Sequence, residues 1–297
     1  MNILITGGTG LVGKSLVTKL KQHQHIVRVL TRSESEEENE FYWNVAEKKI
    51  DEKAFQDLDC IIHLAGANIS ERWTDDYKKE MYSSRIDSAN LLFDYCKKKD
   101  IHLKSFISAS GINYYGTFTS DQILTEQSGF VQNDFLAKLC EQWENAADQF
   151  SEISDRVVCL RTAMVLSRKG GAFPMLRKTA DLNLGAAVGT GLQWMNWIHI
   201  DDLANMYVAA VENSAINGKY NAVADQLPTN KEFMQKLVKA KNKFFFPLNV
   251  PAFVMKSVFG EMSAIILEGT RADNRKIKSQ GFDFKYSTLD EALKNLV

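Results

Sequence analysis

A glycine-rich turn near the amino terminus is the pattern in this 297-residue chain that points most directly to a chemistry. Gly7, Gly10 and Gly13 follow the apolar run Asn2–Thr6 and precede a stretch with helical spacing, residues 14–20. The first glycine lets the chain turn off a strand, the second lets the backbone approach a pyrophosphate, and the third lets the helix pack closely on the sheet. Phosphates would bind at the unpaired N–H groups of the helix amino terminus. The turn therefore predicts a dinucleotide site, with an ordinary glycine turn as the alternative.

The residues after the second apolar run, Ile26–Leu30, bear on which dinucleotide binds. An NAD-specific site usually has an acidic residue near the end of the second strand, where it accepts hydrogen bonds from the ribose 2′-hydroxyl. This chain has Thr31 and Arg32 there instead. A guanidinium can bind a 2′-phosphate through two charge-assisted hydrogen bonds. The alternative is a surface arginine balanced by the acidic residues that follow, Glu34 and residues 36–38. The sequence favours NADP over NAD as the cofactor.

The elements that must position this site follow a regular pattern. Short apolar runs alternate with amphipathic stretches, which is typical of a parallel sheet covered by helices on both faces. The longest predicted helices span residues 75–99 and 134–150. The predicted strands are Asn2–Thr6, Ile26–Leu30, Phe41–Trp43, Cys60–Leu64, Ser105–Ser108 and Val157–Leu160. We therefore expect an α/β fold, a doubly wound parallel sheet of the Rossmann type, with a smaller carboxy-terminal substrate lobe.

The alternation loosens from Ser167 onward, where several glycines indicate irregular chain. We expect residues 1–165 to form an NAD(P)-binding Rossmann domain and residues 166–297 to form the substrate-side lobe. A helical pattern followed by a strand pattern within residues 196–223 predicts that this segment returns to the sheet. Apolar positions between residues 250 and 267 predict a helical cap over the cleft.

Composition limits the classes of protein that fit. Hydrophobic residues at 45% and charged residues at 25% are ordinary globular values. The formal net charge of −1 gives no reason to expect nucleic acid or an anionic membrane as a partner, although local patches remain open. The four cysteines are widely spaced, which predicts neither a metal site nor a disulfide framework. Since no signal peptide or membrane-length apolar run is found, we expect a soluble, cytoplasmic protein that binds a small-molecule substrate. The sequence predicts no particular oligomeric state.

Motifs spread over the whole chain resemble the extended short-chain dehydrogenase/reductase superfamily, and more narrowly its atypical "epimerase family" branch of NAD(P)-binding proteins. Besides the glycine turn, the matching residues are His63–Ala67, Arg72–Thr74, Ser84–Arg85, Ser108–Gly116, Asp134–Cys140, Trp143–Glu144, Val165–Ser167, Gly170–Gly171, Gln193–Trp194, Ile198–Asp202 and Gly260–Met262. The resemblance implies a nucleotide at the carboxyl ends of the strands and a small lobe that closes a substrate cleft. The predicted cofactor-binding residues are Gly7, Thr9, Gly10, Leu11, Val12, Gly13, Thr31, Arg32, Leu64, Ala65 and Gly66.

The chain departs from the superfamily at its usual proton-transfer pair. Most members have Tyr-x-x-x-Lys on the second long helix, because residues four apart share a face and the lysine can lower the pKa of the tyrosine. If Trp143–Glu144 sets the register, Phe135 and Leu139 occupy these positions, and neither can transfer a proton. Asp134 and Lys138 are also four apart, but an exposed salt bridge explains them more simply. The atypical branch likewise lacks the pair.

The catalytic candidates that remain lie in Ser108–Gly116. Related enzymes keep a serine here that hydrogen-bonds the substrate oxygen, so Ser110 is the first candidate. Tyr114 or Tyr115 could replace the missing acid if a second hydroxyl or a water tunes it. The alternative is that Ser110 satisfies backbone groups at a strand end and the tyrosines pack under the lobe.

Other residues have structural or binding interpretations. We expect His63 to be a hydrogen-bonded core histidine and His199 to position a loop or cap the helix that follows it. The aromatic segment Gln193–Trp197 could line the cleft. Arg72 and Arg85 could face the cleft and favour an anionic ligand.

Two functions agree with these observations. The first is an NADP(H)-dependent oxidoreductase or epimerase-like enzyme acting on a small polar, sugar-like substrate. The second is a non-catalytic NADPH-binding sensor or regulatory protein, motivated by Phe135 and Leu139 at the proton-transfer positions. The glycine-rich and aromatic segments around the expected cleft favour the enzyme.

Overall fold

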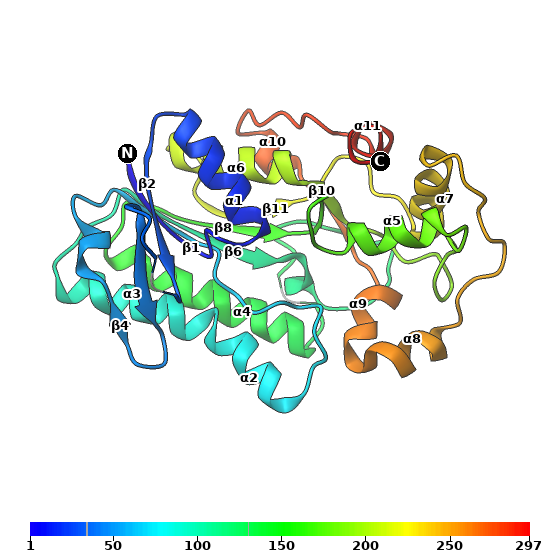
Figure 1. Ribbon diagram of the computed structural model, residues 1–297, viewed down its shortest axis with the longest axis horizontal. Helices are drawn as coiled ribbons and strands as arrows, with labels where there is room; N and C mark the ends of the chain where they lie inside the picture. The colour runs from blue at the N-terminus through cyan, green and yellow to red at the C-terminus, as the bar shows by residue number, and fades with distance from the viewer. Residues whose placement is uncertain (34, 130) are drawn as a thin grey trace.

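The computed structural model describes residues 1–33, 35–129 and 131–297, so Glu34 of the acidic loop lies outside the described residues. Its centre is an eight-stranded sheet with the order β11-β8-β6-β5-β1-β2-β3-β4, in which all pairs are parallel except β3 with β4 (Figure 1). The strands are β1 (Asn2–Thr6), β2 (Ile26–Thr31), β3 (Glu40–Asn44), β4 (Lys49–Ile50), β5 (Cys60–His63), β6 (Ser105–Gly111), β8 (Val157–Thr162) and β11 (Gly218–Ala222). The prediction of a doubly wound Rossmann sheet is confirmed.

The central strands are buried on both faces, which explains their continuous apolar runs. Along β1, Ile3 and Ile5 pack into one apolar layer and Leu4 into the other, and all three are fully buried. Successive side chains of a strand point to opposite faces, so one strand serves both layers. Helices α1 and α6 cover the first face and α3 and α4 the second (Figure 1). They span Leu11–Gln22 (α1), Ile86–Lys98 (α3), Phe135–Asp148 (α4) and Ile200–Glu212 (α6).

The predicted helix over residues 75–99 is wrong in one respect, because it is two helices. Helix α2 (Asp75–Ser83) begins at the cap Thr74 and ends at Ser84, and α3 begins after Arg85. The hydroxyl of Ser84 accepts a hydrogen bond from the Ala67 N–H at 2.8 Å, and the Arg85 guanidinium donates to the Ala67 carbonyl at 2.9 Å. Contacts with a distant loop therefore interrupt a pattern that is continuous in sequence.

The other long helix, α4, starts as predicted, and its first turn explains Asp134. The Asp134 carboxylate accepts hydrogen bonds from the Ala137 N–H at 2.9 Å and the Thr117 N–H at 2.6 Å. Asp134 is thus a helix cap that also holds the preceding loop. This role replaces the salt bridge with Lys138 that the spacing suggested.

The second half of the chain returns to the sheet and then builds a lobe. Strand β11 pairs with β8, and α6 packs on α1. The lobe contains the strand pairs β9 (Met164–Leu166) with β10 (Trp197–His199) and β7 (Ile123–Leu124) with β12 (Arg271–Ala272). Its helices are α5 (Phe173–Asp181), α7 (Asn230–Ala240), α8 (Ala252–Phe259), α9 (Ala264–Leu267), α10 (Arg275–Lys278) and α11 (Leu289–Leu296). The domain division at residue 165 remains our proposal.

Short 3-10 turns complete the list: η1 (Glu52–Phe55), η2 (Ile112–Tyr115), η3 (Gln149–Glu152) and η4 (Gly260–Ser263). All four cysteines are buried free thiols. Among the described residues, no helix combines the length and the apolar character that crossing a membrane requires.

Candidate nucleotide-binding and active site

The glycine turn between β1 and α1 has a backbone that only glycine permits at two positions. Gly7 adopts a φ of 68°, and a Cβ added there would lie 2.8 Å from the Leu64 carbonyl. A Cβ on Gly13 would collide with the carbonyl oxygen of Gly7. The turn is closed by a 3.0 Å hydrogen bond from the Gly10 N–H to that same oxygen. Helix α1 has neither a side-chain cap nor an acidic residue in its first turn. Its amino terminus therefore has the form and the polarity of an anion site.

A buried hydrogen-bond chain fixes the next strand end against this turn. The Nε2 of His63 lies 2.9 Å from the Arg85 carbonyl oxygen, which only accepts, so Nε2 is assigned the proton. Nδ1 then accepts from the Thr6 hydroxyl at 2.8 Å. The Thr6 oxygen accepts in turn from the N–H groups of Leu64 and Ala65. His63 is the hydrogen-bonded core histidine that the sequence predicted, and burial lowers its pKa to about 4.

Arg85 packs against Gly66 and Ala67, in the loop after β5 that is predicted to contact the cofactor. Its guanidinium donates to the carbonyls of Met81 and Ala67, both at 2.9 Å, and lies 5.0 Å from the Trp143 ring. A Cβ on Gly66 would lie 2.9 Å from the guanidinium carbon. Arg85 is only 8% exposed, and burial lowers its pKa. It therefore positions Gly66 and Ala67, whereas the sequence suggested a ligand-facing arginine.

The ribose end of the predicted site lies at the end of β2. Thr31 is buried and its hydroxyl donates to the Ser33 carbonyl, while Arg32 is exposed. Because β2 pairs in parallel with β1, Arg32 follows its strand at the same edge of the sheet as Gly7. This position agrees with the predicted contact to a 2′-phosphate.

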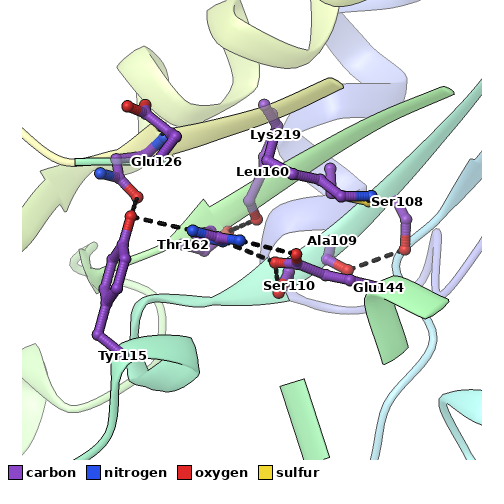
Figure 2. A network of polar contacts seen from close by, with 12 residues as sticks. Ser108, Ala109, Ser110, Tyr115, Glu126, Glu144, Leu160, Thr162 and Lys219 are labelled. Carbon is purple, nitrogen blue, oxygen red and sulfur yellow. Dashed lines mark hydrogen bonds and ion pairs between the residues drawn. The ribbon is translucent and has the colours of Figure 1, made fainter. Parts of the chain in front are cut away.

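The catalytic candidate Ser110 belongs to a buried polar network at the carboxyl ends of β6 and β8 (Figure 2). Its hydroxyl donates to Glu144 at 2.8 Å. Arg161 donates to both carboxylate oxygens of Glu144, at 2.8 and 2.9 Å. All three side chains are at most 3% exposed. Burial alone would lower the pKa of Arg161, but the hydrogen bonds and charge of Glu144 raise it above its ordinary value.

Tyr115 extends the same network. Arg161 donates to the Tyr115 oxygen at 3.0 Å, and the Tyr115 hydroxyl donates to Asn221 at 2.8 Å (Figure 2). Tyr115 is fully buried, and burial raises its pKa to about 12. Both hydrogen-bonding functions of this phenol are thus occupied by side chains of the protein.

Tyr114 is the most exposed of the three candidates. Its side chain is half-buried, and the Arg161 guanidinium carbon lies 3.5 Å from its ring centroid. Its ring also meets Tyr115 edge-on at 5.7 Å. The structure thus brings Ser110, Tyr114 and Tyr115 together around Arg161, and their catalytic roles stay predictions.

Sequence reasoning did not assign three residues to the site. Arg161 and Glu144 connect the members of this network. The sequence signals that could have identified them were a charged residue next to the apolar run of β8, for Arg161, and a charged residue on the apolar face of α4, for Glu144. Gly170 lies over the glycine turn, since a Cβ there would be 3.4 Å from Leu11. In the sequence, Gly170 was one of the residues matching the family and part of the irregular lobe, but it was not predicted to approach the glycine turn.

Two other predictions concern the lobe. His199 caps α6, because its Nδ1 accepts from the Asp201 N–H at 3.1 Å. In the segment Gln193–Trp197, Asn196 bonds the backbone of Thr270 and Ala272, and Trp197 is fully buried. Much of this segment therefore holds the lobe together.

The lobe contacts the Rossmann half beside Phe135 of α4. Lys78 of α2 forms a 2.6 Å ion pair with Glu261 of η4, and its ammonium lies 5.2 Å from the Phe135 ring. Phe135 also packs on Trp73, with ring centroids 5.5 Å apart. The buried Met262 belongs to the same apolar cluster. Residues of α2, α4 and η4 thus form one contact between the two halves.

A parallel sheet in this order, with a glycine turn leading from β1 into α1, defines a dinucleotide-binding Rossmann protein. The model of the NAD dependent epimerase/dehydratase family matches residues 3–222, and the chain belongs to that family. Residues 250–296 match a domain of unknown function, DUF1731. The family resemblance seen in the sequence is confirmed.

Relatives cover the whole chain. The epimerase family protein SAR0825 of Staphylococcus aureus is 35% identical over 298 residues, which is 99% of this chain and 98% of that protein. The epimerase family protein YfhF of Bacillus subtilis is 35% identical and covers 100% and 98%. Among solved structures, the human epimerase family protein SDR39U1 with NADPH is 31% identical, with a TM-score of 0.89 and coverage of 100% and 99%. A nucleoside-diphosphate sugar epimerase from Corynebacterium glutamicum is 28% identical, with a TM-score of 0.81, over 99% of this chain and 57% of that one.

Two glycine substitutions should separate ligand binding from folding. The φ of Gly10 is −75°, which alanine adopts, and its Cβ would lie 3.2 Å from the Gly7 oxygen. We expect Gly10→Ala to keep a melting temperature near that of the wild type but to raise the Kd for NADPH about tenfold or more, because the methyl group occupies the approach of the pyrophosphate. Gly13→Ala should instead destabilise the fold. Fluorescence titration and thermal melting measure both, and unchanged binding by Gly10→Ala would argue against the site.

Because His63 is buried in its neutral state, we expect the stability of the protein to decrease as the pH is lowered. Its pKa is about 4 in the folded protein against 6.5 ordinarily, so between these values the unfolded chain binds the extra proton. The stabilisation is complete above pH 6.5 and is lost as the pH falls towards 4, by about 3 kcal/mol. In urea unfolding, His63→Gln should show a shallower decline by that amount, whereas His102→Gln, at an exposed histidine, should match the wild type. Equal slopes for wild type and His63→Gln would contradict the assignment.

Proposed function

We propose that this protein binds NADPH and is an NADP(H)-dependent oxidoreductase or epimerase-like enzyme acting on a small polar, sugar-like substrate. The observation that carries the proposal is the half-buried Tyr114, stacked on Arg161 at the carboxyl edge of β6 and β8. Strand β6 is separated from β1 and its glycine turn only by β5. A phenol beside a cation at this edge is a suitable proton donor for a carbonyl reduced by a neighbouring dinucleotide. The NADPH in the human relative and the name of the Corynebacterium relative support the cofactor and the substrate class.

The cofactor would contact three segments of one sheet edge. The glycine turn, with Thr9, Leu11 and Val12, would hold the pyrophosphate at the amino terminus of α1. Thr31 and Arg32 would hold the 2′-phosphate. The loop Leu64–Gly66, which is fixed by Thr6 and Arg85, would form the opposite wall.

The proton-transfer step would belong to the chain's own residues. Bound NADPH supplies hydride to the substrate carbonyl carbon. Tyr114 donates its hydroxyl proton to the carbonyl oxygen, so that an alcohol forms and a phenolate remains. Arg161, 3.5 Å from the ring centroid, stabilises that phenolate, and Glu144 keeps the guanidinium in place. An epimerisation would start with the oxidised cofactor, NADP⁺, and the same groups would first act in the reverse direction, with the Tyr114 phenolate accepting the hydroxyl proton.

The contact between the halves favours a second candidate, an NADPH sensor. Lys78 and Glu261 join the lobe to α2, directly beside Phe135, where the superfamily usually has a proton-transfer residue. A lobe that contacts α2 through this ion pair and an apolar cluster could report cofactor binding through a shift between open and closed states.

Replacing Tyr114 tests the enzyme. We expect Tyr114→Phe to lower kcat/KM for carbonyl reduction by about 10²- to 10⁴-fold because the proton donor is lost. The Kd for NADPH should stay within about twofold, a change below about 0.4 kcal/mol. Tyr82→Phe, at an exposed tyrosine of α2, is the matched control. The assay follows NADPH oxidation with carbonyl compounds and nucleotide sugars. Full activity of Tyr114→Phe would exclude Tyr114 as the acid. Absence of turnover, together with NADPH-dependent hydrogen-exchange protection of residues 250–296, would favour the sensor.

Replacing Arg32 tests the choice of cofactor. We expect Arg32→Ala to weaken NADPH binding about tenfold or more, since charge-assisted hydrogen bonds to the 2′-phosphate are lost, and to leave NADH binding unchanged. Lys21→Ala removes an exposed positive charge from the far end of α1 and should alter neither affinity. Calorimetric titration with both dinucleotides measures the difference. Equal affinities of the wild type for NADH and NADPH would refute the preference.

A further inference from the structure

Large exposed apolar side chains gather at the outer edge of the carboxy-terminal lobe. In the segment that joins α7 to α8, Phe244, Phe246 and Leu248 are 65%, 42% and 70% exposed. Leu182 and Leu184, which follow α5, are 59% and 61% exposed. We call these five residues the lobe tip. Monomeric proteins rarely expose contiguous apolar groups of this kind without a binding function.

The five residues of the lobe tip lie on adjacent stretches of chain. The Phe246 N–H donates to the Gly185 carbonyl at 2.9 Å, and the Phe244 N–H donates to the Asn183 side chain at 3.4 Å. The segment between α7 and α8 forms the right-hand edge of the molecule in Figure 1, away from the central sheet. The lobe tip is therefore a projecting surface, separate from the edge of the sheet that carries the predicted cofactor-binding residues.

Helix α8 follows the segment that carries Phe244, Phe246 and Leu248. None of its eight residues is buried, although the sequence is Ala-Phe-Val-Met-Lys-Ser-Val-Phe. Phe253 and Val258 are 72% and 65% exposed. A helix this apolar normally buries one face against the protein. Helix α8 thus adds apolar side chains that the described part of the chain leaves exposed.

The chain segment that carries most of the lobe tip is rich in lysine. Residues 231–260 contain six lysines and one carboxylate, Glu232, although the whole chain has a net charge of −1. Lys236 and Lys241 pair with acidic residues of the protein. Lys239 and Lys243 are exposed and form no ion pair within the described part of the chain, whereas Lys256 lines a surface pocket together with Glu261 and Glu268. An apolar tip surrounded by unneutralised lysines is complementary to a surface with a negative exterior and an apolar interior.

We propose that the lobe tip and α8 dock on an anionic lipid bilayer. Phenylalanine and leucine side chains would enter the boundary between headgroups and acyl chains, and the lysines would remain among the anionic headgroups. A second copy of the chain is a poorer occupant. A two-fold interface would place this patch against itself and bring the lysines of both copies together. The docking would be peripheral, since no described helix can span a bilayer.

Vesicle sedimentation with the full-length protein tests this proposal. We expect binding to phosphatidylcholine vesicles that contain phosphatidylserine, little binding to phosphatidylcholine alone, and release at high salt. The double variant Phe244→Ser, Phe246→Ser should lower the partition coefficient at least about tenfold. Lys239→Gln with Lys243→Gln should weaken binding and reduce its dependence on salt. Ile26→Ser, at an apolar residue 57% exposed on β2, is the matched control and should bind as the wild type.

Folding and self-association are followed in the same samples. The variants should keep the wild-type melting temperature, because every substituted side chain is exposed. The proposal is overturned if phosphatidylserine does not increase binding, or if the phenylalanine variants bind as well as the wild type. It is also overturned if analytical ultracentrifugation shows a dimer that the phenylalanine substitutions dissociate while vesicles bind no protein. That result would assign the lobe tip to contact with a second copy.

Discussion

The hydrogen bond between Thr6 and His63 is the constraint on which the cofactor edge depends. Gly7 and Leu64 follow these residues directly, on neighbouring strands of the sheet. The Thr6 oxygen accepts from Leu64 and Ala65, and the imidazole donates to the carbonyl of Arg85, so one chain of donors joins β1, β5 and the start of α3. Full burial excludes water as a substitute partner and keeps the ring neutral. The close approach that requires glycine at position 7 follows from this arrangement.

The ion pair between Glu144 and Arg161 likewise fixes the positions of its neighbours, at the carboxyl ends of β6 and β8. A buried ion pair contributes little net stability, because desolvating two charges offsets most of their attraction. Its effect here is geometric. The carboxylate is shared between Ser110 and Arg161, and the guanidinium is shared between Glu144, Tyr115 and the ring of Tyr114. Removing either charge would leave the other buried without its partner, so the network holds as a unit.

Local sequence patterns predicted the features that arise from the burial of neighbouring residues, such as the strands and the glycine turn. They did not predict the features that arise from contacts with residues distant in the sequence. The apolar runs identified the long strands because both faces of each are covered. The glycine turn was recognised because Gly7 and Gly13 need no side chain. Periodicity could not show the break at Ser84 and Arg85, since its cause is the loop at Ala67. It also could not show that Ser110 lies under Glu144, because the burial of a hydroxyl depends on which helix covers the strand end.

The net charge of the whole chain did not reveal how unevenly charge is distributed along it. The carboxy-terminal lobe has a lysine-rich outer side, at the lobe tip, and an inner side that contacts α2. The net charge of −1 is the sum of an acidic half, residues 1–165 with a formal charge of −6, and a basic half, residues 166–297 with +5, which contains the lysine-rich segment 231–260. Helix α8 connects the two sides of the lobe, because Phe253 is exposed and the following Phe259 and Met262 join the apolar cluster beside Phe135. A ligand that holds the outer face of α8 therefore also acts on the element that contacts α2. If occupation of the cofactor edge moves this element, binding at the two places is coupled, and the coupling free energy is the same in both directions.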